Sequence, residues 1–271
     1  DQTFRAKLEH CLRLTCTLCH SPVNNSFAPG IGNRLDGWPN TDLNIGAIIA
    51  LSPAITPAQK AVYSSWGPGK YDPRYNVDGK NTPIVLPPAY GLSAIRNETF
   101  TADGPISYWN AYVAIVQMHG RGNFSDARLN IHIRQSPDLV APKLAALAAY
   151  QHSIPAPPPP SGSFDAAAAQ RGRVVFGRSC IGCHVGVSGT DNNAGVLHAP
   201  AETGMDGAYA ARTANRAYRT TPLRALWQHA PYFHDGSAAT LEAVVEHYDR
   251  VRALRLTPQQ KADLVQFLES L

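Results

Sequence analysis

The sequence Cys-Ile-Gly-Cys-His at residues 180–184 repeats the pattern of Cys-Thr-Leu-Cys-His at residues 16–20. On a helix, cysteines three positions apart project from one face, where each can form a thioether bond to a haem vinyl group. The histidine that follows reaches the iron from the proximal side, so the pattern is the attachment signature of c-type haem. Zinc would need four ligands, which this pattern does not supply. The sequence therefore predicts two haem c groups, attached through Cys16, Cys19, Cys180 and Cys183 and ligated by His20 and His184.

A proline-rich stretch separates the two motifs. Residues 155–163 read Pro-Ala-Pro-Pro-Pro-Pro-Ser-Gly-Ser, which favours an extended segment and cannot continue a helix. A chain of 271 residues is long enough for two domains with separate cores. We therefore predict a first haem domain at residues 1–155, a linker at residues 156–163 and a second haem domain at residues 164–271.

Each predicted domain begins with a helix that leads toward its motif and closes with another helix. We expect these helices at residues 3–14 and 140–152 in the first domain, and at residues 165–173 and 257–271 in the second. This order is that of class I cytochrome c folds. The long middle of the first domain is rich in Gly, Pro and Asn, which predicts loops rather than strands. The expected fold is mainly α, with two tandem class I cytochrome c-like domains, the first with a long loop-rich insertion.

Composition narrows the class of protein. A hydrophobic content of 44% and a charged content of 16% fit a folded globular chain rather than a disordered one. The net charge of +4 comes without a dense Lys/Arg run, so it indicates an acidic redox partner and not nucleic acid. No stretch approaches the roughly 20 apolar residues of a membrane helix. Because haem c is attached outside the bacterial cytoplasm, we expect a periplasmic protein whose signal peptide has been removed before Asp1.

Two further features each allow a structural and a functional interpretation. Cys11, the fifth cysteine, is expected to be a small buried thiol, and the alternative is a crosslinking or redox-sensitive thiol near the haem edge. A group of aromatic residues in the first domain is expected to form core, and the alternative is a haem pocket or an electron relay. The group comprises Trp66, Tyr71, Tyr75, Tyr90, Tyr108, Trp109 and Tyr112.

Three segments of the second domain carry a family resemblance. They are Thr-Pro-Leu-Arg at 221–224, Ala-Pro-Tyr-Phe-His-Asp-Gly-Ser at 230–237 and Thr-Leu-Glu-Ala-Val-Val-Glu-His-Tyr at 240–248. Together they closely resemble the C-terminal haem domain of the bacterial dihaem cytochrome c peroxidase superfamily. That group includes the tryptophan-modifying dihaem oxygenases of methylamine utilisation and the dihaem rubber oxygenases. The resemblance covers roughly residues 165–271 and is weak over the first domain. It implies that Arg224 and His234 lie near the haem propionates, and it would allow a calcium ion between the domains.

The sixth ligand of each iron separates an electron carrier from a catalyst, because an open face admits peroxide or oxygen. In the superfamily, the distal ligand of the second haem is a Met, Tyr or His on the helix after Thr-Leu-Glu. By register the Met position falls on Tyr248. We expect the neighbouring His247 to be the ligand, because imidazole is the commoner iron ligand, with Tyr248 as the alternative. Met205, His229 and His234 are further candidates.

For the first haem, the candidates follow a predicted buried helix at residues 106–118. Met118 and His119 lie where this helix meets a glycine-rich turn, and either could be aimed at the iron. Only one can bind, because adjacent residues on a helix point about 100° apart. His132 is the third candidate. The flexible loop with a distal His and the acidic or amide residue of the peroxidases are not recognisable in the sequence.

The sequence thus predicts a periplasmic dihaem cytochrome c that transfers electrons through two covalently bound haems. The alternative is a dihaem peroxidase or oxygenase with an open first haem. A haem-based sensor or small-ligand carrier would also need an open iron, and no motif indicates one.

Overall fold

The computed structural model describes residues 16–271, and this part of the chain is mainly helical, as expected. The predicted helix at residues 3–14 and Cys11 lie outside the described residues. Within residues 16–271, no helix is both long and apolar enough to cross a bilayer. The strands form two antiparallel pairs, β1 (Lys70–Tyr71) with β2 (Ile84–Val85) and β3 (Phe124–Asp126) with β4 (Ile131–Ile133).

Short helices and loops make up most of the first half of the chain. The first motif forms α2 (Cys16–His20), and after a long loop come α3 (Ile45–Ala50), α4 (Pro57–Ser64) and α5 (Tyr75–Asp78). α4 begins with a capping box between Thr56 and Gln59. α3 crosses α4 so closely that a Cβ on Gly46 would lie 1.9 Å from the Tyr63 carbonyl oxygen. The segment predicted as loops therefore also contains three short helices and one strand pair.

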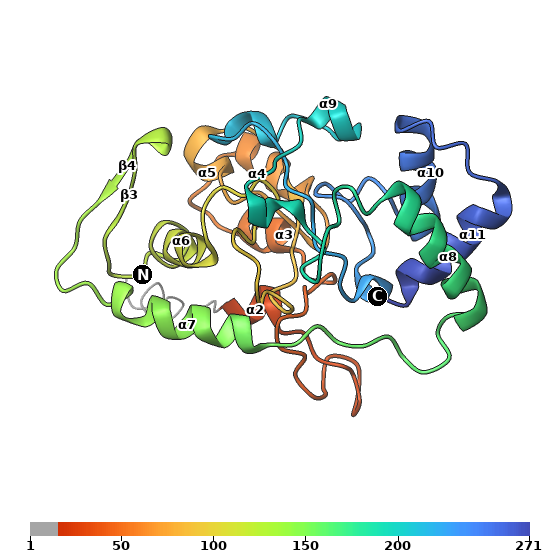
Figure 1. Ribbon diagram of the computed structural model, residues 1–271. Coiled ribbons are helices and arrows are strands. Elements are labelled where there is room, and N and C mark those ends of the chain that lie inside the picture. The colour runs from red at the N-terminus through yellow and green to blue at the C-terminus, as the bar shows by residue number, and fades with distance from the viewer. Residues whose placement is uncertain (1–15) are drawn as a thin grey trace.

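The first half has its own apolar core around α6 (Ile106–Tyr112). This helix continues as a π-helical segment (Val113–Gln117) and packs against α7 (Ala141–Ser153), at one end of the molecule (Figure 1). The predicted helices at residues 106–118 and 140–152 are thus present. Of the aromatic group noted in the sequence, four residues are buried in the core, namely Trp66, Tyr90, Trp109 and Tyr112.

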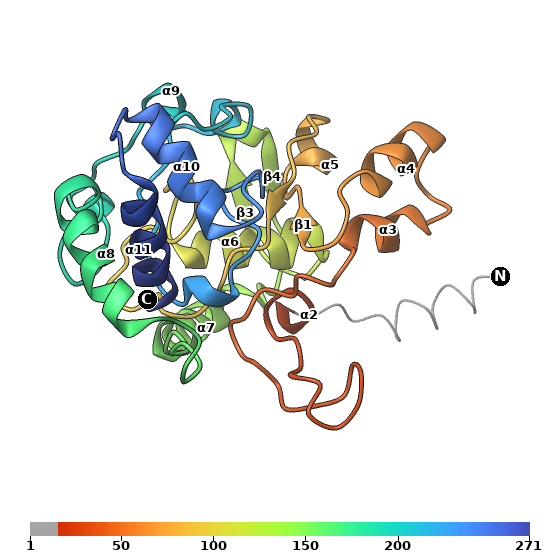
Figure 2. The ribbon, with the colours of Figure 1, turned by 90° about the vertical axis from the view of Figure 1, so that its right-hand side faces the viewer.

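The second half is built on three longer helices. α8 (Ala166–Ser179) crosses α11 (Pro258–Glu269), and α10 (Leu241–Val251) packs against α11. Asp165 caps α8, and Thr257 forms a capping box with Gln260 at the start of α11. A Cβ on Gly172 would lie 1.9 Å from the Asp263 carbonyl oxygen, so only glycine permits this crossing. Figure 2 shows α3 and α4 on the opposite side of the molecule from these helices.

The remaining turns of helix are short. They are α9 (Pro200–Thr203) and the 3₁₀ segments Ala127–Leu129, Asp191–Ala194, Ala210–Arg212 and Leu226–Gln228.

The two halves meet over a seam of hydrogen bonds and ion pairs as well as through the proline-rich linker. Arg212 donates to Asp72 at 2.7 Å and to Asp78 at 2.8 Å, and its backbone carbonyl accepts from Arg74 at 2.9 Å. The backbone N–H of Val85 donates to the His234 carbonyl at 2.8 Å. This seam brings residues near 70–100 beside residues near 205–236, where the site described next is lined from both halves.

Candidate haem-binding sites

The second motif continues the C-terminal end of α8 by one helical turn. The backbone N–H of Cys180 donates to Phe176, and that of His184 donates to Cys180 at 3.1 Å. This turn keeps both cysteines and the histidine near one another. His184 Nδ1 lies 3.2 Å from the Gly189 carbonyl oxygen, which fixes the ring and leaves Nε2 for iron. Burial lowers the pKa of His184, so its imidazole is neutral, as iron ligation requires.

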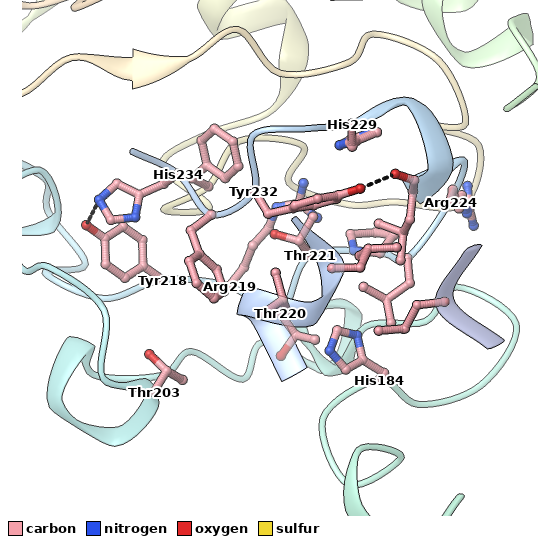
Figure 3. Close-up of a pocket in the computed structure, with 18 of the residues that line it drawn as sticks. His184, Thr203, Tyr218, Arg219, Thr220, Thr221, Arg224, His229, Tyr232 and His234 are labelled. Carbon is pink, nitrogen blue, oxygen red and sulfur yellow. Dashed lines mark hydrogen bonds between the residues drawn. The ribbon is translucent and has the colours of Figure 1, made fainter. Parts of the chain in front are cut away.

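A cavity of about 370 Å³ opens directly beside this motif (Figure 3). Cofactor sites commonly have volumes of about 300–1,000 Å³. Cys180, Cys183 and His184 line the cavity, and most of its other lining side chains are apolar. Those contributed by α8, α10 and α11 include Phe176, Leu241, Val245, Leu264 and Leu268. Two thiols, one neutral imidazole and an apolar wall match the needs of a haem c.

The two residues expected to supply the distal ligand of the second haem face different ways. Tyr248 lines the cavity, and burial raises the pKa of its hydroxyl to about 12, with Cys183 and Cys180 adding to the effect. His247 does not line it. Its Nε2–H donates to the Thr203 carbonyl at 2.8 Å, and its ring packs against Phe233 at 4.9 Å between centroids. The structure therefore brings Tyr248 toward the haem position and places His247 beside α9.

The other histidine and methionine candidates of the second half all line the cavity. His234 is buried, and its Nε2 lies 2.9 Å from the Tyr218 hydroxyl (Figure 3). His229 Nε2 is shielded from solvent without a hydrogen-bond partner in residues 16–271, and burial lowers its pKa to about 4. Met205 lines the cavity from the loop after α9. These three residues are thus near the proposed haem, with the His234 ring already hydrogen-bonded.

Two arginines reach the cavity from the segment before His229. Arg224, expected near the propionates, uses Nη1 to donate to the carbonyls of Gly91 and Ser93. Arg219 was not singled out in the sequence, yet it lines the same cavity and is held by the carbonyls of Glu98 and Thr99. Its only sequence signal is its position, five residues before Arg224 in the segment with the family resemblance.

A polar cluster of Asp191, His198 and Glu202 lies beside the second motif. The backbone N–H of Asp191 donates to Cys183 at 3.0 Å. His198 bridges Asp191 at 3.0 Å and Glu202 at 2.9 Å. Burial opposes the charged form of His198, but these two carboxylates raise its pKa above the ordinary value. Cys183, Asp191 and His198 are close enough to hold a metal ion, but Cys183 belongs to the haem motif, so we assign the cluster to support of that motif.

The loop that follows the first motif folds back onto it. The backbone N–H of Gly37 donates to His20 and that of Asn40 to Cys19, each at 2.8 Å. Burial lowers the pKa of His20 to about 4, so this imidazole is also neutral. In contrast to His184, His20 Nδ1 has no hydrogen-bond partner in residues 16–271, although the Pro87 carbonyl lies near enough to favour the charged ring slightly.

A cavity and a groove both border the first motif. The cavity beside the second motif extends to Pro39 and to Pro87, which lie next to Asn40 and His20. A separate groove of about 630 Å³ is shallow and open to solvent, and it is lined by Leu18 among others. The first motif therefore borders both the shared cavity and a groove that is open to solvent.

The three residues expected to ligate the first iron lie away from this space. His119 is exposed in the turn after α6, with a left-handed backbone at φ 53°. His132 is exposed on β4 and lies 3.1 Å from the Ser125 hydroxyl. Met118 is half-buried. None of the three lines the cavity or the groove described above.

An amide that the sequence did not reveal lies near the first motif. Gln117, in the π-helical segment, accepts from the Tyr71 hydroxyl at 2.6 Å and donates to the Pro73 carbonyl at 2.7 Å. Burial raises the pKa of Tyr71, and Cys19 is close enough to contribute. A half-buried phenol and a half-buried amide therefore form a fixed polar pair, with the phenol close enough to Cys19 to feel its charge.

Comparisons with known proteins agree with the motifs. Residues 217–255 match the RoxA-like, cytochrome c-like family. The methylamine utilization protein MauG of Methylorubrum extorquens is 31% identical over 129 residues, covering 38% of this chain and 34% of that protein. A cytochrome-c peroxidase of Denitromonas iodatirespirans is 27% identical over 248 residues, covering 66% of each chain. The chain thus spans between a third and two thirds of the length of these relatives.

Two solved structures match at low TM-scores. A MauG-like protein associated with microbial copper homeostasis is 27% identical, covers 47% of this chain and 55% of its own, and gives a TM-score of 0.38. Hydrazine synthase of Kuenenia stuttgartiensis is 20% identical, covers 70% of this chain and 73% of its own, and gives 0.47. Scores at this level do not establish a common overall fold.

Proposed function

Because the chain is a relative of the dihaem cytochrome c peroxidases, MauG and the RoxA-like cytochromes, and carries two haem c motifs, we propose that it is a peroxidase-like dihaem oxidoreductase. In this proposal the haem held by His184 would store and pass electrons, and the haem held by His20 would supply an iron with room for a small oxidant such as peroxide. The observation that carries it is that none of the three residues expected to ligate the first iron, Met118, His119 and His132, lines the cavity or the groove beside the first motif. The sequence alone favours a carrier with two closed irons.

For the second haem, we propose Tyr248 rather than His247 as the residue that faces the iron. A bound haem c supplies an iron that gains and loses one electron. His184 would hold that iron from one side, with its ring fixed by Gly189. Tyr248 lines the cavity, while His247 is engaged by Thr203. A closed iron of this kind suits electron storage.

For the first haem, we propose that Gln117 and Tyr71 form the polar side of the reaction site. His20 would hold the iron, and its neutral ring is available for that role. The amide of Gln117 is fixed by Tyr71 at Oε1 and by Pro73 at Nε2, so its Oε1 is preorganised to accept one further hydrogen bond from a small polar molecule.

The proposal keeps the predicted division into haem domains at residues 1–155 and 164–271, with a linker at 156–163. It also keeps the prediction that both domains have class I cytochrome c folds. A periplasmic location and an acidic redox partner belong to the same proposal. The seam described above accounts for the contact between the halves without calcium. Its carboxylates, Asp72 and Asp78, are paired with the guanidinium group of Arg212. This arginine supplies positive charge of the kind that a calcium ion would bring.

The test is the low-temperature electron paramagnetic resonance spectrum of the ferric two-haem protein. The proposal expects one high-spin and one low-spin haem, and turnover of hydrogen peroxide with an artificial electron donor. Two low-spin signals without any high-spin component, together with absent turnover, would instead establish an electron carrier.

Two variants then assign the closed haem. Tyr248→Phe is expected to change the spin state or visible spectrum of the low-spin haem, while His247→Ala leaves it unchanged. The reverse pattern would return the ligand role to His247. In the first half, His119→Ala is expected to have no spectral effect, whereas a loss of a low-spin signal in His119→Ala or Met118→Ala would show that the first iron is closed.

A further inference from the structure

Arg219 is a half-buried cation whose guanidinium group is held in place by backbone carbonyls. Its Nε–H donates to Thr99 at 2.6 Å and its Nη2 donates to Glu98 at 2.9 Å. Both acceptors belong to the first half, whereas Arg219 belongs to the second. The remaining nitrogen, Nη1, is shielded from solvent and has no hydrogen-bond partner in residues 16–271. The guanidinium group is thus oriented by two contacts, and its Nη1 nitrogen is free to donate.

The charge of Arg219 is not compensated by a paired carboxylate among the described residues. The nearby carboxylate of Glu98 is used elsewhere, because it binds His152 Nε2 at 2.9 Å and accepts from the backbone N–H of Ile106 at 2.8 Å. Burial lowers the pKa of Arg219 to about 10, although Glu98 opposes this shift. The group therefore stays charged at neutral pH in a place where a charge without a partner is costly.

The free donor belongs to the haem cavity. Eight buried side-chain polar atoms in residues 16–271 have no hydrogen-bond partner, and only those of Arg219 and His229 belong to residues that line the cavity. His229 is neutral because burial lowers its pKa to about 4. Among the cationic residues that line the cavity, Arg219 is thus the one with a buried nitrogen that has no hydrogen bond within residues 16–271. Both cysteines and the histidine of the second motif line the same, largely apolar cavity. Figure 3 shows Arg219 and His184 there.

We propose that Arg219 binds a propionate carboxylate of the second haem through Nη1. This inference rests on haem attachment at Cys180 and Cys183, and it does not depend on whether the first iron is open. A haem brings carboxylates into the cavity, and a charge-assisted hydrogen bond to a fixed guanidinium satisfies both groups. Arg224, which the family resemblance implies for this role, already directs its Nη1 to Gly91 and Ser93.

The contact has a structural and a redox consequence. The same guanidinium would bind the haem of the second half and the backbone of Glu98 and Thr99 in the first half, so haem attachment would strengthen the seam. Loss of the cation would leave the propionate charge uncompensated and would favour the ferric over the ferrous iron. The midpoint potential of the second haem is therefore expected to fall when Arg219 is neutralised.

The experiment is a redox titration of the two-haem protein, followed by visible spectroscopy, on Arg219→Gln, Arg219→Lys and the control Arg216→Gln. Arg216 is exposed and does not line the cavity, so the control removes the same charge nearby. In Arg219→Gln, the ferric-to-ferrous ratio of the second haem at fixed potential is expected to rise about tenfold, or about 59 mV for one electron. The control is expected to change it less than twofold.

A resonance Raman spectrum of the propionate bending band supplies a second readout, which is sensitive to hydrogen bonds at the propionate. Both Arg219 variants are expected to shift this band, and Arg216→Gln is not. An unchanged potential in Arg219→Gln together with an unshifted band would overturn the proposal, and the cation would then serve an adventitious anion such as phosphate or the seam alone. If Arg219→Gln does not accumulate with two haems, an unshifted band in Arg219→Lys is decisive against it.

Failure of the proposed function gives a different result. A chain that mass spectrometry shows to carry fewer than two haems would contradict the dihaem assignment itself. Two low-spin irons would contradict the peroxidase-like role and leave the assignment of Arg219 to the second haem standing.

Discussion

The same five-residue pattern lies in two different surroundings in this molecule. The second copy extends the fourteen-residue α8, which is locked against α11, and its histidine ring is fixed by a backbone carbonyl. The first copy forms the five-residue α2, is held by a returning loop and borders an open groove, and its His20 Nδ1 has no partner in residues 16–271. The pattern therefore defines where haem is attached, while the surrounding structure determines how tightly each iron is enclosed.

Removing the cysteines of one motif at a time should give the largest difference in stability between the two surroundings. We consider two double variants, the first Cys180→Ala with Cys183→Ala and the second Cys16→Ala with Cys19→Ala. Each is expected to lose one covalent haem, which haem staining and mass spectrometry would detect. An unfilled apolar cavity of about 370 Å³ should lower the free energy of unfolding by on the order of 5 kcal/mol or more in the first of these. The second should be affected less, because its motif borders solvent. Equal destabilisation in thermal melts would contradict the difference in enclosure.

The helix crossing behind the second motif offers the next largest effect. Gly172→Ala places a methyl group against the Asp263 carbonyl, so we expect a loss of about 3 kcal/mol in unfolding free energy and a disturbed spectrum of the second haem only. Gly177→Ala, in the same helix, meets nothing within 4 Å and should stabilise by about 0.5 kcal/mol through helix propensity. Chemical denaturation of both variants checks the pair, and a harmless Gly172→Ala would mean that α8 and α11 can separate.

The counterpart in the first half is Gly46, whose Cβ would contact the Tyr63 carbonyl. Gly46→Ala is expected to disturb the α3–α4 pair and to leave the second haem unchanged. A change in the second haem would show that the two surroundings are coupled more strongly than their separate cores suggest.

A pH series on Asp126 probes the charge network of the first half. Arg128 holds the pKa of this buried carboxyl at about 2, with Tyr108 contributing. A lowered pKa contributes stability that is fully present above the unfolded value near 4 and is lost as the pH falls toward 2. Asp126→Asn should therefore be less stable than the parent by about 2 kcal/mol at pH 7, with the gap closing between pH 4 and pH 2. A gap independent of pH would show that the carboxylate charge is not the cause.

Removing a helix cap should give the smallest loss of unfolding free energy, and the loss should be similar in the two halves. Thr257→Ala and Thr56→Ala each remove a capping box, and each is expected to cost about 1 kcal/mol of unfolding free energy. Because these caps lie in different halves, similar losses would show that local helix signals contribute alike on both sides. A much larger loss for Thr257→Ala would assign extra weight to α11 in enclosing the second haem.

Helices of the second half were predictable because their signals are local and strong. Asp165 and Thr257 mark the starts of α8 and α11, and the structure shows both residues as caps. The same kind of signal, Thr56 followed by Pro57 and Gln59, begins α4 inside the segment predicted as loops, so this helix could have been found. The strand pairs could not, because strands of two or three residues are too short to show an alternating pattern.

The sequence predicts the residues of the two Cys-x-x-Cys-His motifs, but it does not predict the other residues of the two sites. Chemistry favours His247 as an iron ligand, but adjacent helix positions point about 100° apart, and the packing of α10 turns Tyr248 toward the cavity. Arg219 and Gln117 depend on contacts with residues far away in sequence, such as Thr99 and Tyr71, which no local pattern encodes. The distal ligands and the roles of Arg224 and His234 stay predictions.

The ion pair between Arg212 and Asp72 also constrains the order of maturation. The two residues are 140 positions apart, so their contact cannot form until the chain is available as far as Arg212. Before that, Asp72 and Asp78 stay hydrated, and one wall of the seam is missing. Cys16 and Cys19 can therefore meet haem while their half of the protein is still unfinished. The second motif is made after the first half, and its haem can be the last component to close the structure.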